Sequence, residues 1–221
     1  MITVEFARTL YENSDPVHDF DHVLRVLALA QRIGAVEGAN MAVVETAVLL
    51  HDSDRNLDRA GDESGPGPAA HAPDTVSTDH AVIAAANARH ILNRLDPAPD
   101  ADFIAAVVHA IEAHRFRNAI EPQTLEAKVV FDADKLDAIG AIGIVRAYAY
   151  GARAGKKLWA EVSPDYAGGD PDHTPVHEYV YKLARIQERM QTATGRTIAR
   201  ERHAYMVAFF ERLGQEVRGT V

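Results

Sequence analysis

The sequence of 221 residues contains no cysteine, which excludes disulfide bonds, thiolate catalysis and zinc sites built on cysteine. No apolar run approaches the roughly 18 residues that a membrane-spanning helix needs, so we expect no association with a membrane. The first ten residues include Glu5 and lack the basic-then-apolar layout of a secretory signal. We therefore expect a soluble cytoplasmic protein.

Positive charge is scarce relative to negative charge. There are 23 Lys and Arg against 32 Asp and Glu, which gives a net charge of −9. Large nucleic acids bind to basic surfaces, so this balance argues against such a partner. It does not exclude a small anionic substrate, because a metal ion and a few local cations can hold one. The chain is long enough for one sizeable core.

Apolar residues recur with the period of about 3.6 residues that is typical of amphipathic helices, and no segment alternates as a strand does. We expect helices over residues 20–37, 41–51, 79–95, 101–114, 124–150, 176–192 and 197–216. The helix from 124 should bend at Gly140 or Gly143, and Thr194-Gly195 should divide the last two helices. The fold class is therefore all-α. We expect a single compact helical bundle over residues 1–150, followed by a C-terminal helical extension over 151–221 that packs on the same core.

Glycine and proline are concentrated in two segments that we expect to be loops. Six of the thirteen residues from 61 to 73 are Gly or Pro, which indicates a mobile loop over about residues 53–79. Loops of this length are usually functional lids or disordered. A second loop is expected from 163 to 175.

Two imidazoles and two carboxylates stand in positions that suggest a metal site: His22, the neighbouring pair His51-Asp52, and Asp134. His22 falls on the apolar side of its helix, and a buried neutral histidine needs a hydrogen-bond partner or a metal. Neighbours on a helix point about 100° apart, so His51 and Asp52 can share an ion at a helix end. Such a ligand set suits Mn²⁺, Fe²⁺, Co²⁺ or Zn²⁺. Each signal alone is weak, since single core histidines and chance His-Asp pairs are common.

Three stretches of the sequence resemble signatures of one known family: His18 to Val26, Leu49 to Asp52, and Asp132 to Gly143. Together they are similar to the pattern H…HD…D of the HD superfamily of metal-dependent phosphohydrolases, and in particular to its YedJ/YpgQ-like bacterial subgroup. The C-terminal pattern of that subgroup resembles His177-Glu178-Tyr179, Lys182-Leu183, Met190-Gln191-Thr192, Arg196 and Arg202. The resemblance covers about residues 15 to 216. It departs after the HD pair, where the subgroup often has a short acidic segment and this chain has Ser53-Asp54-Arg55 and the loop rich in Gly and Pro.

The resemblance implies an HD-domain helical bundle whose metal ligands are His22, His51, Asp52 and Asp134. It implies a divalent metal cofactor, with Mn²⁺ favoured and Mg²⁺, Co²⁺, Fe²⁺, Zn²⁺ or Ni²⁺ as alternatives. The substrate would be a small phosphorylated molecule, with a nucleotide favoured. The reaction would be pyrophosphohydrolysis of a nucleoside triphosphate, or nucleotide phosphatase or phosphodiesterase activity. A homodimer is left open.

Helical geometry helps to choose within the acidic cluster of residues 132–137. Asp132 and Asp134 are two residues apart and fall on nearly opposite faces of a helix, so only one of them should contact the metal. Asp134 and Asp137 are three apart and share a face, which makes Asp137 a candidate hydrogen-bond partner of a metal ligand.

Other polar residues are candidates for catalysis. Asp54 or a carboxylate near His18 would accept the proton from water, and His18 could orient a ligand. The alternatives are an exposed loop carboxylate for Asp54 and a helix cap for His18. Arg25, Lys135 and Lys182 could neutralise substrate phosphate. A solvated face is the competing interpretation for all three, and a phosphate contact is favoured only for Lys182.

Three further histidines raise the question of a second metal ion. One branch of the superfamily holds a second metal with two histidines that lie between the HD pair and the last Asp, and His80 with either His109 or His114 occupies such places. His114-Arg115-Phe116 resembles an H-S-F element with Arg in place of Ser. One metal is favoured, and histidines that contact substrate would look the same. The alternatives to hydrolysis are a dinuclear-iron oxygenase of the HD type and a non-catalytic nucleotide-sensing module.

Overall fold

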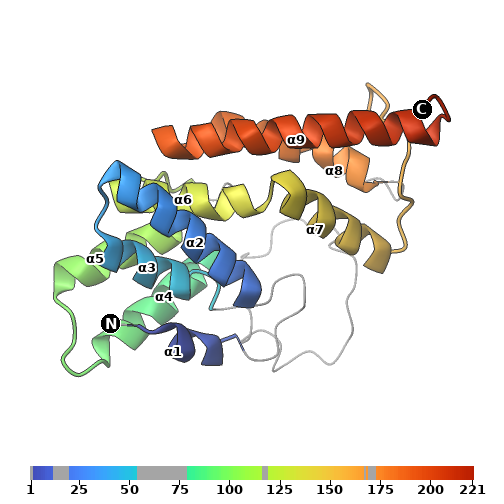
Figure 1. Cartoon of the computed structure of the whole chain (residues 1–221). Helices are drawn as coiled ribbons and strands as arrows, with labels where there is room; N and C mark the ends of the chain where they lie inside the picture. Colours follow the sequence, from blue (N-terminus) through green and yellow to red (C-terminus); the bar gives the residue numbers. More distant parts are fainter. Residues whose placement is uncertain (1, 12–19, 54–78, 116–118, 167, 169–172) are drawn as a thin grey trace.

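The structure, a computed structural model, describes residues 2–11, 20–53, 79–115, 119–166, 168 and 173–221. Within these ranges all regular structure is helical (Figure 1). The helices are α1 Val4–Thr9, α2 Phe20–Glu37, α3 Met41–Leu50, α4 His80–Asn93, α5 Ala101–Glu112, α6 Leu125–Asp137, α7 Gly140–Arg153, α8 Pro175–Tyr181, the 3₁₀ helix η2 Leu183–Arg189, and α9 Ala193–Val217. The prediction of an all-α fold is confirmed. No helix in the described part of the chain is long and apolar enough to cross a membrane.

The centre of the bundle is α3, which packs against α2, α5 and α6. Seven of its ten residues are buried: Val43, Val44, Thr46, Ala47, Val48, Leu49 and Leu50. A helix that is apolar on all sides belongs in the interior. Its C-terminal end, and with it His51, therefore lies inside the protein.

The single helix predicted from 124 to 150 is divided in two, since α6 ends at Asp137 and α7 begins at Gly140, where the bend was expected. Gly140 has a φ of +77°, a left-handed conformation that favours glycine. A Cβ atom at Gly143 would collide with the carbonyl oxygen of Ala138, so this turn is tight enough to need a second glycine.

The C-terminal part differs from the predicted pair of helices. The single helix expected over 176–192 is wrong, since α8 ends at Tyr181 and the 3₁₀ helix η2 follows. A 3₁₀ helix has three residues per turn, so Leu183 and Ile186 fall on one face, and both are buried.

The expected break at Thr194-Gly195 is also wrong. Thr192 caps α9 by accepting a hydrogen bond from the backbone N–H of Gly195. Gly195 therefore lies inside the first turn of α9. This position needs glycine because a Cβ atom there would collide with the Asp132 carboxylate.

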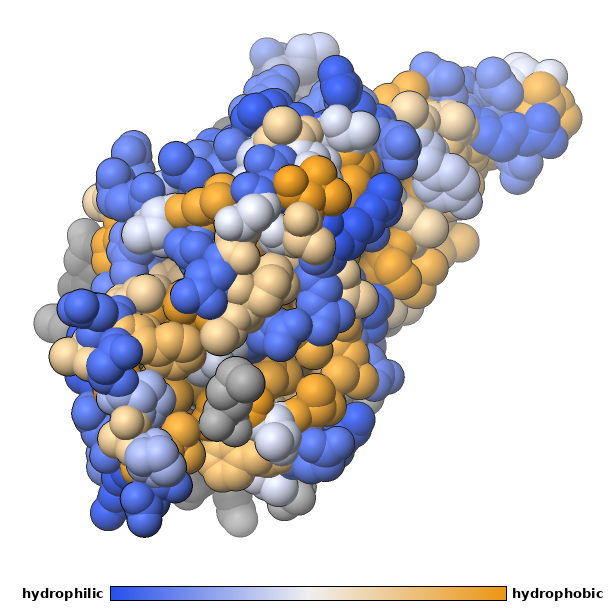
Figure 2. Space-filling view, turned by 60° about the vertical axis from the view of Figure 1, so that its left-hand side comes forward, coloured by the Kyte–Doolittle hydropathy of each residue, from blue (hydrophilic) through white to orange (hydrophobic). Residues whose placement is uncertain are grey.

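The C-terminal helix α9 lies along one side of the molecule and contacts α2, α6 and α7. The division of the chain near residue 150 stays a prediction. In the space-filling view of Figure 2, hydrophilic and hydrophobic residues are intermixed over the visible face.

Candidate metal centre

His22 is presented by the first turns of α2 and is buried, with 4% of its surface exposed. Its Nδ1 lies 2.7 Å from Oδ2 of Asp137, at the end of α6. A carboxylate can only accept, so the hydrogen in this bond belongs to Nδ1. Nε2 then faces the other acidic groups, 3.3 Å from Oδ1 of Asp134 and 3.8 Å from Oδ2 of Asp52.

His51 caps the C-terminus of α3 and is fully buried. Its Nδ1–H donates to the carbonyl oxygen of Val48 at 2.7 Å, which fixes the ring and leaves a lone pair on Nε2. Nε2 is buried and has no hydrogen-bond partner among the described residues. A buried polar atom without a partner costs about 1–3 kcal/mol. This orphaned atom is therefore a feature that needs an explanation.

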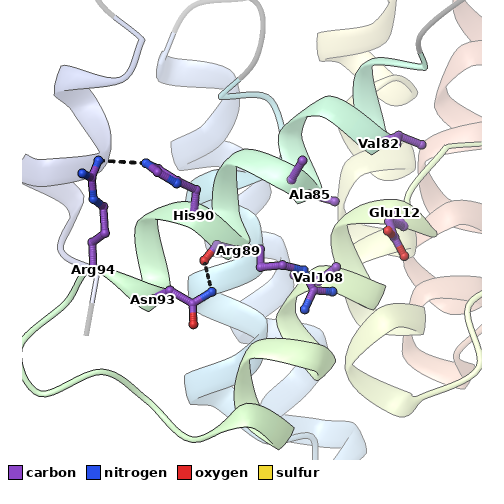
Figure 3. A pocket seen from close by; sticks show the side chains of 9 residues that line it. Val82, Ala85, Arg89, His90, Asn93, Arg94, Val108 and Glu112 are labelled. Carbon is purple, nitrogen blue, oxygen red and sulfur yellow. Dashed lines mark hydrogen bonds between the residues drawn. The ribbon is translucent and has the colours of Figure 1, made fainter.

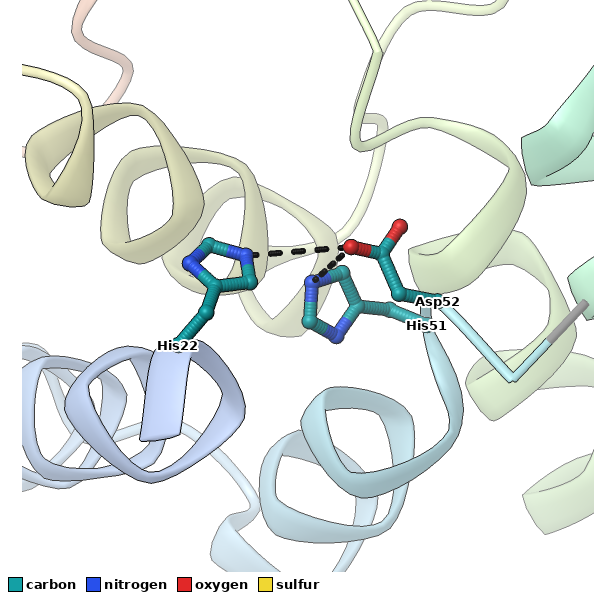
Figure 4. A group of neighbouring side chains, drawn as sticks. All are labelled: His22, His51 and Asp52. Carbon is teal, nitrogen blue, oxygen red and sulfur yellow. Dashed lines mark ion pairs between the residues drawn. The ribbon is translucent and has the colours of Figure 1, made fainter. Parts of the chain in front are cut away.

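Asp52 follows His51 at the helix end and completes a compact group (Figure 4). One ligand atom from each of His22, His51 and Asp52 lies within 4.8 Å of the others. Asp52 Oδ2 is 3.7 Å from His51 Nε2. The backbone N–H of Asp52 donates to the hydroxyl of Tyr11, which itself donates to the carbonyl of Leu49, so α1 supports this helix end.

Asp134 joins the same group from α6. Its Oδ1 lies 3.3 Å from Nε2 of His22 and 3.8 Å from Nε2 of His51. The structure thus brings together all four residues that the resemblance implied as ligands, from α2, the end of α3 and α6. Two buried imidazoles with nitrogen atoms turned toward two carboxylates form a donor set that fits a divalent ion.

Asp132 points to the opposite side of α6. Its buried carboxylate accepts hydrogen bonds from the backbone N–H groups of Gln191 and Thr192, both at 2.8 Å, and from the Thr192 hydroxyl at 2.7 Å. These bonds tie the start of α9 to α6. Asp132 therefore serves the packing of the C-terminal helix, in accord with the argument that only one of Asp132 and Asp134 faces the site.

The charges of the site favour a cation. Burial lowers the pKa of His22, but hydrogen bonds to Asp134 and Asp137 and the charge of Asp52 outweigh it and raise the pKa to about 9. Burial also acts to raise the pKa of Asp134, yet Lys135 and His22 hold it well below its usual range. Asp134 thus stays ionised, and the raised pKa of His22 reflects the negative charge of the carboxylates that face it.

His114 adds a third imidazole beside this group. Its ring lies edge-on to that of His51, with 5.2 Å between the centroids. Its Nδ1–H donates to the Ile111 carbonyl at 2.6 Å, and burial lowers the pKa of His114 to about 4. His114 is therefore a neutral imidazole at neutral pH, with Nε2 able to accept a hydrogen bond.

The other two candidate histidines are placed differently. His109 accepts a hydrogen bond at Nε2 from the backbone N–H of Gln123, 3.0 Å away. His80 is the exposed first residue of α4. Its neighbour Asp79 forms an ion pair of 2.8 Å with Arg115, which follows His114. This ion pair holds the start of α4 close to the end of α5. Arg115, which stands where the H-S-F element has serine, is thus engaged by Asp79.

The candidate phosphate-binding cations are all engaged by carboxylates. Lys135 Nζ lies 2.7 Å from Oδ2 of Asp134, beside the centre. Arg25 Nε lies 2.8 Å from Oδ1 of Asp137. Arg146 of α7, which the sequence analysis missed, also reaches Asp137, at 3.0 Å. A buried, charged carboxylate such as that of Asp137 needs cationic partners, and this requirement is the signal that could have pointed to an arginine like Arg146.

Lys182 belongs to a different group. Its exposed ammonium lies 2.6 Å from Oε1 of Glu178, and Oε2 of Glu178 lies 3.2 Å from His173. Tyr166 bonds to His173 in turn, so this group stabilises the start of α8. His18 and Asp54, predicted for proton transfer or ligand orientation, lie outside the described residues.

A surface hollow of about 400 Å³ lies between α4 and α5 (Figure 3). It is lined by Val82, Ala85, Ala86, Arg89, His90, Asn93, Arg94, Val108 and Glu112. None of the predicted site residues is among them, and the hollow is open to solvent. The buried group around His51 is therefore the better candidate for chemistry.

Comparisons with known proteins show the family to which the chain belongs. Residues 19–139 match the family model described as the HD domain. The chain is 34% identical over 219 residues to YpgQ from Bacillus subtilis, covering 97% of this chain and 91% of YpgQ. The crystal structure of YpgQ in complex with ADP superposes with a TM-score of 0.69 at 30% identity, covering 98% of this chain and 99% of that one. An HD-superfamily hydrolase from Bacillus thuringiensis has a TM-score of 0.70 at 26% identity, covering 97% and 94% of the two chains.

Proposed function

The chain belongs to the HD-domain family, and from this premise we propose that it is a metal-dependent phosphohydrolase that acts on a nucleotide. The resemblance to HD-superfamily hydrolases supports a hydrolase in general. The observation that carries the proposal of a metal centre is Nε2 of His51, a buried atom that faces three other potential ligands and finds no hydrogen-bond partner in the part of the chain that the structure describes.

The residues present fit a divalent ion on physical grounds. Both imidazoles are fixed through Nδ1, His22 by Asp137 and His51 by the Val48 carbonyl, so that Nε2 of each faces the carboxylates. Metal-ligating histidines almost always donate their other ring N–H in this way. His22, His51, Asp52 and Asp134 would hold the ion. When bound, it would supply a Lewis acid that activates water and polarises a phosphoryl oxygen.

The chain's own groups around the centre divide the remaining tasks. Lys135 lies beside Asp134 and would neutralise charge on a phosphate brought to the ion. The neutral ring of His114 would accept a hydrogen bond from water or substrate. Asp54 or a carboxylate near His18 would accept the proton that water loses. Lys182, which is exposed near α8, would contact a more distant part of the substrate.

A nucleotide is the favoured substrate because the related YpgQ structure was solved in complex with ADP. The specific reaction that we propose is hydrolysis of a nucleoside triphosphate between its α- and β-phosphates. Water adds to the α- or the β-phosphorus, and the P–O bond between that phosphorus and the oxygen that bridges the two phosphates breaks. Nucleoside monophosphate and pyrophosphate are released.

The test is a panel of nucleoside triphosphates, diphosphates and monophosphates incubated with purified protein and Mn²⁺. We expect nucleoside monophosphate and pyrophosphate as products, separated by chromatography. His51→Ala or Asp52→Ala should abolish turnover, whereas Asp102→Asn, an exposed change in the first turn of α5, should not. Metal-loaded protein that leaves the whole panel intact would refute the proposal.

A further inference from the structure

Asp137 is a buried carboxylate, with 1% of its side chain exposed, on which three cationic or hydrogen-bonding groups converge. His22 and Arg25 reach it from α2, and Arg146 reaches it from α7. We propose that Arg25 and Arg146 form an arginine clamp that fixes Asp137 and, through it, holds His22 in position for the metal. This inference rests on the proposed function insofar as the centre binds a metal ion.

Arg25 holds both oxygens of the carboxylate. Its Nε lies 2.8 Å from Oδ1 and its Nη2 lies 3.1 Å from Oδ2, which is the two-pronged geometry in which a guanidinium matches a carboxylate. Arg25 stands three residues after His22, so both side chains leave α2 on the same face. The same helix therefore presents the ligand and one arm of the clamp to Asp137.

Arg146 approaches from a separate helix. Its Nη1 donates to Oδ2 of Asp137 at 3.0 Å and to the Asp137 carbonyl at 3.4 Å. The turn at Gly140 makes this possible, because it folds α7 so that a residue in its second turn reaches back to the end of α6. Arg202 of α9 donates to the neighbouring carbonyl of Leu136. The partly negative C-terminus of α6 is thus neutralised from three helices.

The clamp acts on His22 because all three groups share one oxygen. Oδ2 of Asp137 accepts from His22 at 2.7 Å, from Arg25 at 3.1 Å and from Arg146 at 3.0 Å. With its lone pairs occupied from three directions, the carboxylate cannot rotate without breaking a charged hydrogen bond. The direction of the His22 ring, and hence of Nε2, follows from the direction of that oxygen. Loss of either arginine frees the carboxylate and should misalign the ligand.

This role differs from the contact with substrate phosphate that the sequence suggested for Arg25. An arginine that binds substrate phosphate affects KM for the nucleotide and leaves metal affinity unchanged. An arginine that positions Asp137 affects metal affinity in the absence of any substrate. The two roles therefore separate in a metal titration.

The experiment is calorimetric titration of the purified protein with Mn²⁺, without nucleotide. Asp137→Asn should weaken the affinity by about 10–100-fold, as is typical when a group that orients a metal ligand is removed. Arg25→Gln and Arg146→Gln should each weaken it measurably but by less than Asp137→Asn does, because they act one step further from the ion. Arg146→Lys should restore part of the loss, since it keeps the charge. Matched controls are Arg32→Gln on α2 and Arg153→Gln on α7, both exposed and expected to match wild type.

A double-mutant cycle tests whether the arginines act through Asp137. In the Asp137→Asn background, Arg25→Gln and Arg146→Gln should cause no further loss of Mn²⁺ affinity. Wild-type affinity in both single arginine variants, or fully additive losses with Asp137→Asn, would overturn the clamp. Circular dichroism of each variant checks that the helices are intact, so a loss of affinity is not a loss of fold.

The outcomes for the clamp and for the proposed function are distinguishable. Protein that binds Mn²⁺ but hydrolyses no nucleotide refutes the hydrolase, while the ratio of variant to wild-type affinity still decides the clamp. Wild-type protein that binds no divalent ion overturns both. Variants with normal metal affinity and a raised KM would return Arg25 to the role of a phosphate contact and overturn the clamp.

Discussion

Replacement of Asp52 by Asn tests the metal centre through thermal stability, without assuming a substrate. Asp52 is 6% exposed, and the change keeps the size and polarity of its side chain. It removes the charge of the carboxylate, whose Oδ2 lies 3.8 Å from Nε2 of His22 and 3.7 Å from Nε2 of His51. A ligand that binds only the folded state stabilises it by RT ln(1 + [L]/Kd). At a Mn²⁺ concentration of one hundred times Kd this amounts to about 2.7 kcal/mol.

The expected shifts in Tm follow from the size of the chain. A protein of 150–250 residues gains about 2–4 °C per kcal/mol, so Mn²⁺ should raise the wild-type Tm by about 5–11 °C. If Asp52→Asn weakens binding by about a hundredfold, the same Mn²⁺ concentration stabilises the variant by only about 0.4 kcal/mol. Its Tm should then rise by about 1–2 °C.

The assay is differential scanning calorimetry of each protein in EDTA and in Mn²⁺. The difference between the two conditions is read for each variant, so any change in the stability of the metal-free protein cancels. Asp102→Asn is the control for removal of a carboxylate elsewhere and should show the wild-type shift. If Asp52→Asn keeps the full Mn²⁺-dependent rise, Asp52 does not hold the ion and the reasoning fails.

Two further predictions concern the packing of α9 and the number of ions. Gly195→Ala should lower stability in urea unfolding although alanine favours helix by about 1 kcal/mol, because its Cβ would displace the Asp132 carboxylate; a stabilised variant would contradict this. Equilibrium dialysis should find one tightly bound Mn²⁺ per chain, and His114→Ala should keep that ion. Two ions in wild type and one in His114→Ala would instead support a dinuclear centre.

The sequence predicted the helices well where one face is apolar and the other polar. The expected range 20–37 coincides with α2, and the bend at Gly140 follows from the local requirement for glycine. The prediction failed after residue 175, where the pattern is set by contacts with distant residues. Gly195 was expected to end a helix, yet it lies inside α9. Glycine is needed there because the Asp132 carboxylate, from far earlier in the chain, occupies the space that a side chain would fill.

The sequence was enough to propose the residues of the candidate metal centre, but not the residues that hold them in position. The order of His22, His51, Asp52 and Asp134 resembled a known pattern, and the structure places these residues together. The partners of Asp137 could not be deduced, because the approach of Arg146 depends on how α7 folds back after the turn. Likewise the sequence left open whether His109 or His114 belongs to the site, and only the packing of α5 places His114 beside His51.

By itself, then, the sequence determined what depends on local spacing: the amphipathic helices before residue 175, their apolar faces, the glycine turn and the opposite directions of Asp132 and Asp134 along one helix. The tertiary structure alone decided which groups from different helices meet. It placed Arg25 and Arg146 on Asp137, Asp132 at the start of α9, and the buried lone pair of His51 opposite the carboxylates. The physical reason is that helix periodicity fixes the direction of a side chain relative to its own axis, whereas a hydrogen bond between helices depends on how both axes pack.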